Sequence, residues 1–148
     1  MFQRLQDYHA WMLAILDEVE PLLRDGVERP SARYLSVRRE AMGRTLSAYQ
    51  RFVHQEFFDP LIAGGSAADA ALARAMKIEC IDMTEGFRRI QRKWMGQDVS
   101  DHWEEYRAVA LEMMAQMRRH IADVASIARA MSPASDRSSP DTPGPAAP

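Results

Sequence analysis

Four long segments of this chain repeat apolar side chains in alternating steps of three and four residues. Such spacing keeps the apolar side chains on one face of a helix, where they can be buried together. The stripe of the first segment consists of Phe2, Leu5, Met12, Leu16, Val19 and Leu23. Because no alternating strand pattern competes with these segments, the sequence predicts an all-α fold.

The predicted helices cover about residues 2–24, 31–58, 67–95 and 101–131. Pro21 lies inside the first helix and predicts a kink or restart after Glu20. Asp59 and Pro60 are typical of a cap followed by a first-turn proline, so one further short turn is expected before Gly64. Ser100 or Asp101 is the expected cap of the last helix. Four long helices with short connections predict an antiparallel bundle with up-down-up-down topology.

The domain organisation follows from an abrupt change of composition at residue 132. A chain of 148 residues fits one domain with a sizeable core, and all the apolar periodicity lies within residues 1–131. Residues 132–148 hold five of the eight prolines and almost nothing that can be buried. We therefore expect a helical domain followed by a disordered tail rich in Pro, Ser and Ala.

The charge balance excludes several classes of partner. With 19 basic and 21 acidic residues the net charge is −2, which favours neither nucleic acid nor an anionic membrane surface. No apolar run is long enough to cross a bilayer, and the N-terminus lacks the layout of a signal peptide. These features predict a cytoplasmic protein that binds neither nucleic acid nor membrane.

Conventional enzyme motifs do not appear in the sequence. The single cysteine, Cys80, excludes an internal disulfide and every multi-cysteine zinc pattern. There is no Gly-rich phosphate loop, no nucleophile-elbow pattern and no His-Glu-x-x-His zinc signature. We therefore expect a binding or sensing protein rather than an enzyme.

Three polar residues interrupt the apolar stripes. His9 lies in the first stripe, Glu79 in the third and His120 in the fourth, so all three side chains should point inward. His54 sits on the flank of the second stripe. At about 1.5 Å per residue, these four positions fall within a band of roughly 8 Å along the predicted bundle. The sequence thus predicts one polar layer, because a buried polar group is costly unless it is paired or bound to a metal.

Two interpretations of this layer remain open. In one, the histidines and carboxylates form a hydrogen-bonded network that fixes the register of the helices. In the other, they bind a metal, since imidazole and carboxylate suit iron, manganese or zinc. Two further carboxylates are candidates, because Glu56 occupies the opposite flank of the second helix and Asp123 is close to His120 on the fourth.

Three stretches carry a family resemblance. Residues 5–13 contain His9 and resemble the first helix of the hemerythrin-like (HHE cation-binding) family, which places a histidine there. Residues 52–61 contain His54 and are similar to that family's second helix, with its acidic residues and closing aromatic-proline turn. Residues 117–121 resemble the start of its last metal-binding segment. The resemblance implies a four-helix bundle with a non-haem iron site, typically two irons bridged by carboxylates, in proteins that bind oxygen, respond to redox state or handle iron.

The chain departs from this family pattern at several metal-binding positions. The family's histidine followed four residues later by glutamate is missing, because Phe58 follows His54 at that spacing and Val124 follows His120. Glu79 stands where the family usually has a histidine. Reversible oxygen carriage is therefore not expected. A single metal ion held by three imidazoles and Glu79, or a vestigial site without metal, fits these residues better.

The sequence leads to two hypotheses about function. The first is a hemerythrin-like protein that binds one non-haem metal ion, iron by preference, and senses metal, oxygen or redox state. Its candidate ligands are His9, His54, Glu79, His120, Glu56 and Asp123. The second is a metal-free interaction module, in which the polar layer is structural and the outward face of the third helix, with Ile78 and Ile81, contacts a protein partner or a second copy.

Overall fold

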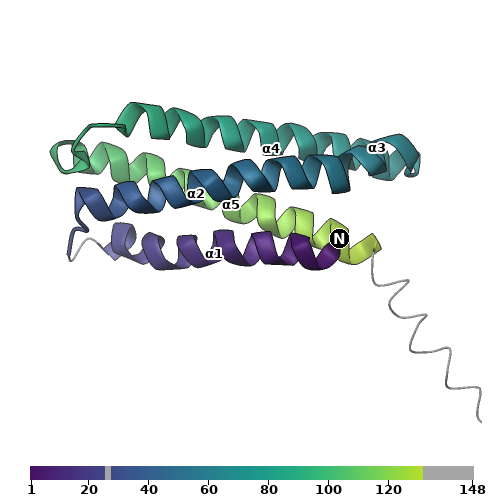
Figure 1. Cartoon of the computed structure of the whole chain (residues 1–148), viewed down its shortest axis with the longest axis horizontal. Helices are drawn as coiled ribbons and strands as arrows, with labels where there is room; N and C mark the ends of the chain where they lie inside the picture. Colours follow the sequence, from purple (N-terminus) through teal and green to yellow (C-terminus); the bar gives the residue numbers. More distant parts are fainter. Residues whose placement is uncertain (26–27, 132–148) are drawn as a thin grey trace, which may run out of the picture.

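The computed structural model describes residues 1–25 and 28–131, and these residues form a helical bundle (Figure 1). Its four long helices are α1 (Phe2–Asp25), α2 (Ala32–Val53), α4 (Ala67–Trp94) and α5 (Trp103–Met131). A short helix α3 (Asp59–Gly64) precedes α4. No strand occurs in the described ranges, which confirms the all-α prediction. The predicted tail, residues 132–148, lies outside the described residues.

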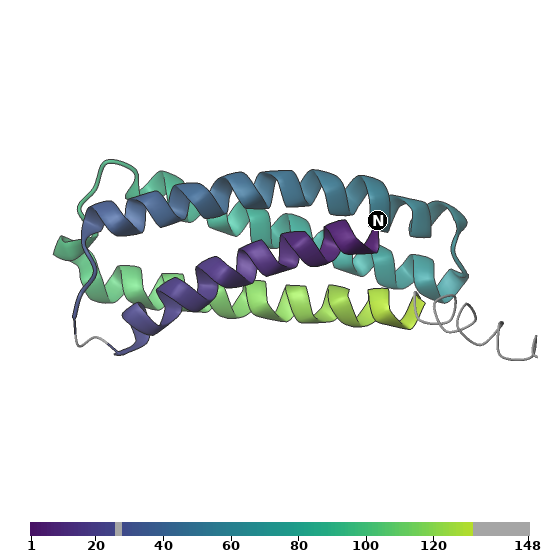
Figure 2. The same cartoon turned by 60° about the horizontal axis from the view of Figure 1, so that its bottom comes forward.

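Each long helix packs against two others, so the core lies along the centre of the bundle (Figures 1 and 2). α1 and α4 both pack against α2 and α5. The stripe predicted for the first helix is the buried face of α1, where Leu5, His9 and Met12 are among the buried residues. Within the described residues, no helix combines the length and apolar character needed to span a membrane.

Serine and aspartate side chains cap three of the helical segments. Ser31 Oγ accepts a hydrogen bond from the backbone N–H of Tyr34 at 3.1 Å, and Ser66 caps α4 in the same way. At the last helix the predicted cap was wrong. Asp98 accepts from the backbone N–H of Ser100, a 3₁₀ turn covers Val99–His102, and α5 begins after it. Asp98 therefore takes the capping role expected of Ser100 or Asp101. Its carboxylate accepts from a backbone N–H group that has no partner within the first helical turn.

The end of α2 also differs from the expected break at Asp59. The chain stays helical from α2 into α3 through one π-helical turn, His54–Phe58. The N–H of Asp59 bonds to the carbonyl of His54, five residues earlier. A proline has no N–H and its ring crowds the carbonyl four residues before it, so a wider turn beside Pro60 relieves that conflict. The extra residue also places Phe57 and Phe58 together in the core.

α1 continues through Pro21 to Asp25, so the helix does not restart after Glu20. α4 ends before Gly96, whose φ of +72° lies in the left-handed region that favours glycine. The loop after α4 therefore depends on a residue without a side chain.

Candidate functional site

A chain of three hydrogen bonds crosses the core and takes one residue from each long helix. Nε2 of His9, on α1, lies 3.1 Å from the hydroxyl of Tyr49 on α2. The same hydroxyl lies 3.0 Å from Nε2 of His120 on α5. Nδ1 of His120 lies 3.0 Å from Oε1 of Glu79 on α4. The four helices are thus joined at one level by polar side chains, which we call the polar layer.

Burial controls the protonation of this layer. His120 and Tyr49 are completely buried, and His9 is buried as well. Burial lowers the pKa of His9 from 6.5 to about 4, with a smaller contribution from the nearby His120. Burial also lowers the pKa of His120, although the hydrogen bond and charge of Glu79 act in the opposite direction. At neutral pH both imidazoles are therefore uncharged, and burial raises the pKa of Tyr49 well above 10, so its hydroxyl keeps its proton.

These protonation states determine the direction of each hydrogen bond. A carboxylate only accepts, so the proton of neutral His120 lies on Nδ1 and is donated to Glu79. Nε2 of His120 then carries a lone pair and accepts the hydroxyl proton of Tyr49. The hydroxyl oxygen in turn accepts from the N–H of His9. Each donor in the layer therefore meets one acceptor.

His54 lies beside this layer without joining its hydrogen bonds. It opens the π-helical turn, its ring packs 5.6 Å from that of Phe58, and its side chain is half-buried. Its Nε2 is buried with no hydrogen-bond partner among the described residues. Burial is the main reason that its pKa is lowered, and the charges of Lys77 and His120 add to the effect. His54 is therefore a neutral imidazole with one unused buried nitrogen.

The structure does not bring the other two candidate carboxylates into the layer. Glu56 is exposed and forms an ion pair with Arg4 at 2.8 Å. Asp123 is exposed too, and it reaches His120 only through its charge, which raises the pKa of the imidazole. Glu79 does join the layer, but through the outer nitrogen of His120 rather than at the side that faces Tyr49.

Tyr49 is the functional residue that sequence reasoning missed. Its place in the apolar stripe of the second helix marked it as a core residue, and its hydroxyl gave no separate signal in the sequence. A tyrosine at the level of two inward histidines is the pattern that could have revealed it, because a buried hydroxyl needs a partner.

Cys80, which follows Glu79, is completely buried, and burial raises the pKa of its thiol to about 12. It is therefore not a reactive thiol in the folded protein.

In the layer, the imidazole nitrogens of His9 and His120 are both directed at the phenol oxygen of Tyr49. Such donors suit first-row transition metals such as iron, zinc or copper. Within residues 1–25 and 28–131, no three His, Cys, Asp or Glu side chains are grouped closely enough to hold a metal ion. His9 and His120 could therefore bind a metal only if the oxygen of Tyr49 served as the third ligand. Glu79 would then stay hydrogen-bonded to Nδ1 of His120 and would not contact the metal.

Comparison of the chain with protein-family models, with curated proteins and with solved structures found no match.

Proposed function

We propose that the protein binds one transition-metal ion at the polar layer, inside a hemerythrin-like bundle with up-down-up-down topology, and that it senses metal, oxygen or redox state. The observation that supports the proposal is the convergence of two buried imidazole Nε2 atoms, of His9 and His120, on the hydroxyl oxygen of Tyr49. A bound iron ion would add redox chemistry that no side chain of the layer supplies by itself.

The protonation state of the two histidines supports metal binding. Neutral imidazole is the form that binds metals, and burial keeps His9 and His120 in this form at neutral pH. Glu79 accepts from the outer nitrogen of His120, as carboxylates commonly do behind a metal-bound histidine, and this leaves Nε2 of His120 unprotonated. A metal would replace the hydrogen bonds of Tyr49 to both histidines, and His9 would then carry its proton on Nδ1. Nε2 of His54 in the adjacent turn, which has no hydrogen-bond partner in the described part of the chain, is a further neutral donor.

A second candidate function has its own observation. The three hydrogen bonds from His9 to Glu79 give every donor an acceptor without an ion, so the layer also works as a device that fixes helix register. In that case function would lie on the surface, where Ile78 on α4 is 68% exposed. Ile81 is half-buried and contributes less to such a contact.

The test is the metal content of protein purified without chelator or His-tag, followed by titration with Fe²⁺ and Zn²⁺. The proposal expects near-stoichiometric metal in the wild type and its loss in His9→Ala and His120→Ala, with helical content retained by circular dichroism. His102→Ala is the matched control, because His102 is exposed and takes no part in the layer's hydrogen bonds.

Two results would overturn the metal proposal. One is a folded wild-type protein that is isolated without metal and takes up neither ion. The other is metal content that is equal in His120→Ala and His102→Ala, which would place the ion elsewhere. Either result would leave the polar layer as a structural device and turn attention to the surface around Ile78.

A further inference from the structure

A polar pocket of about 410 Å³ opens at the surface between α2 and α4, beside the π-helical turn. All eight residues that line it have polar side chains. None of the four residues that form the hydrogen bonds of the polar layer is among them. Such walls suit a small ligand without an apolar part, because hydrocarbon gains nothing from contact with polar groups.

The charge of this pocket is positive, although the net charge of the whole chain is −2. Three cationic side chains, Arg51, Lys77 and Arg88, line it together with one carboxylate, that of Asp59. Nζ of Lys77 lies 2.7 Å from Oδ1 of Asp59, so these two charges neutralise each other and the two arginines carry the remaining charge. A recess lined by one sign of charge concentrates small ions of the opposite sign.

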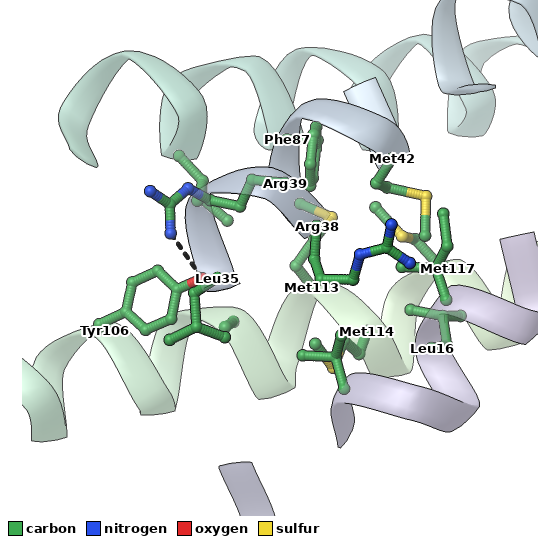
Figure 3. Close-up of a pocket in the computed structure, with 14 residues that line it drawn as sticks. Leu16, Leu35, Arg38, Arg39, Met42, Phe87, Tyr106, Met113, Met114 and Met117 are labelled. Carbon is green, nitrogen blue, oxygen red and sulfur yellow. Dashed lines mark hydrogen bonds between the residues drawn. The ribbon is translucent and has the colours of Figure 1, made fainter. Parts of the chain in front are cut away.

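The guanidinium groups of Arg51 and Arg88 have no partner within the described ranges, since they form neither an ion pair nor a hydrogen bond there. An arginine earlier on α2 shows the contrast. Arg39 lines an apolar cavity of about 50 Å³ and donates to the hydroxyl of Tyr106 at 3.1 Å (Figure 3). Arg51 and Arg88 instead approach one polar pocket from two helices, so an anion in it would contact both charges.

Neutral side chains add further hydrogen-bond donors to the pocket. The Ser47 hydroxyl and the side-chain amides of Gln50 and Gln55 line it on the same side as Arg51. Their spacing of three and four residues keeps them on one face of the helix. A hydroxyl has one O–H donor, an amide has two N–H donors and a guanidinium has five. A ligand with several acceptor oxygens fits these donors better than a carboxylate, whose two oxygens a single guanidinium can satisfy.

We propose that this pocket binds the phosphate group of a small soluble molecule, held between Arg51 on α2 and Arg88 on α4. A phosphate group is tetrahedral and carries up to two negative charges at neutral pH, so its oxygens can accept from both guanidinium groups at once. Ser47 and Gln50 would donate to the remaining oxygens. The lining offers no apolar side chain that could enter a bilayer, which favours a soluble ligand over a lipid headgroup. The proposal does not depend on a metal at the polar layer.

Three probes test this assignment in the full chain: inorganic phosphate, glycerol 3-phosphate and acetate. Affinity is measured by calorimetry at about 0.15 M salt, which screens attraction between distant exposed charges. EDTA is present throughout, so that no metal ion can hold the anion. We expect a phosphate probe to bind with a Kd below about 1 mM, and acetate to bind at least tenfold more weakly. The Nε–H signals of Arg51 and Arg88 in ¹H–¹⁵N spectra should shift with the phosphate probe. The ratio of the two phosphate affinities shows whether the preferred group is free or esterified.

Single variants separate recognition in the pocket from a general effect of charge. Arg51→Gln and Arg88→Gln should each weaken phosphate binding at least tenfold. Both side chains are exposed, so their replacement should leave the bundle folded, which circular dichroism checks. Arg74→Gln is the matched control, because Arg74 is an exposed arginine of α4 that forms no ion pair among the described residues and does not line the pocket. It should leave the affinity unchanged.

Three results would overturn the proposal. The first is a wild-type protein that gives neither heat nor signal shifts up to millimolar concentrations of both phosphate probes. The second is an equal loss of affinity in Arg74→Gln and Arg51→Gln, which would show a general effect of charge. The third is a protein that ignores both soluble probes but sediments with vesicles of phosphatidylcholine and phosphatidic acid, since the ligand would then be a lipid headgroup. Phosphate binding in EDTA that is lost in Arg51→Gln and Arg88→Gln would support the site even if the polar layer held no metal.

Discussion

Nδ1 of His120 lies 3.0 Å from Oε1 of Glu79, and this contact joins the interior of the bundle to its surface. The His120 side chain is completely buried, whereas the Glu79 side chain is 34% exposed. The carboxylate can therefore orient the imidazole while part of it stays in water. A carboxylate buried as deeply as His120 would carry a far larger desolvation cost.

Tyr49 should be the most sensitive member of the polar layer. Tyr49→Phe keeps the ring in place but leaves Nε2 of both His9 and His120 without a partner. An unsatisfied buried polar group costs about 1–3 kcal/mol, so urea unfolding should show a loss in this range. The control is Tyr34→Phe, because the hydroxyl of Tyr34 bonds to the exposed Glu18 and its loss should cost under about 1 kcal/mol. Equal losses in the two variants would contradict the proposed role of the Tyr49 hydroxyl.

The stability of the protein should fall when the pH drops below about 6.5. Burial lowers the pKa of His9 to about 4, so between these values the unfolded chain binds a proton that the folded protein does not. Stability therefore rises with pH across this window, and at pH 5 His9 alone should cost about 2 kcal/mol relative to pH 7. The lowered pKa of His120 acts in the same direction.

This pH dependence is measured as the free energy of unfolding in urea between pH 7 and pH 5, above the range in which most carboxyl groups titrate. His9→Leu should flatten the profile, and the exposed His102→Gln should leave its slope unchanged. A profile with the same slope in wild type and His9→Leu would show that the His9 imidazole is not held neutral by burial.

Replacing two glycines near helix ends by alanine should change the stability of the protein in opposite directions. Gly96 has φ +72°, so Gly96→Ala forces a side chain into the left-handed region and should destabilise by about 1 kcal/mol. Gly64 is the last residue of α3, and an added Cβ would meet no atom within 4 Å. Gly64→Ala should therefore stabilise by up to about 1 kcal/mol. Thermal melts of the two variants test this, and a loss of stability in both would refute the contrast.

Side-chain periodicity was enough to predict that two histidines lie in the core. His9 and His120 replace apolar residues in regular stripes, and in the structure both are buried in the core. The same reasoning placed Glu79 inward, but its side chain stays 34% exposed and only its carboxylate reaches the buried His120. Helix geometry is local, so the face on which a residue lies follows from its position along the chain.

The second helix shows where this reasoning fails. A regular α-helix was assumed through Phe58, and on that basis His54 and Glu56 flanked the polar layer. The π-helical turn His54–Phe58 changes the direction of the side chains that follow it, and Glu56 pairs with Arg4 at the surface. The sequence shows that Pro60 must disturb the helix. It does not show that a π-helical turn accommodates the proline, because that depends on the neighbours that bury Phe57 and Phe58.

The sequence by itself determined the helices, their buried faces and the presence of two histidines in the core, because these follow from the 3.6-residue period within each segment. Only the tertiary structure decided that Tyr49 joins the histidines, that Glu79 takes the outer nitrogen of His120, and that an apolar cavity forms beside Arg39. Those features depend on how far each helix is shifted and rotated against its neighbours. Hydrogen bonds that act over about 3 Å and cavities the size of a few methyl groups are sensitive to such shifts, whereas a hydrophobic stripe is not.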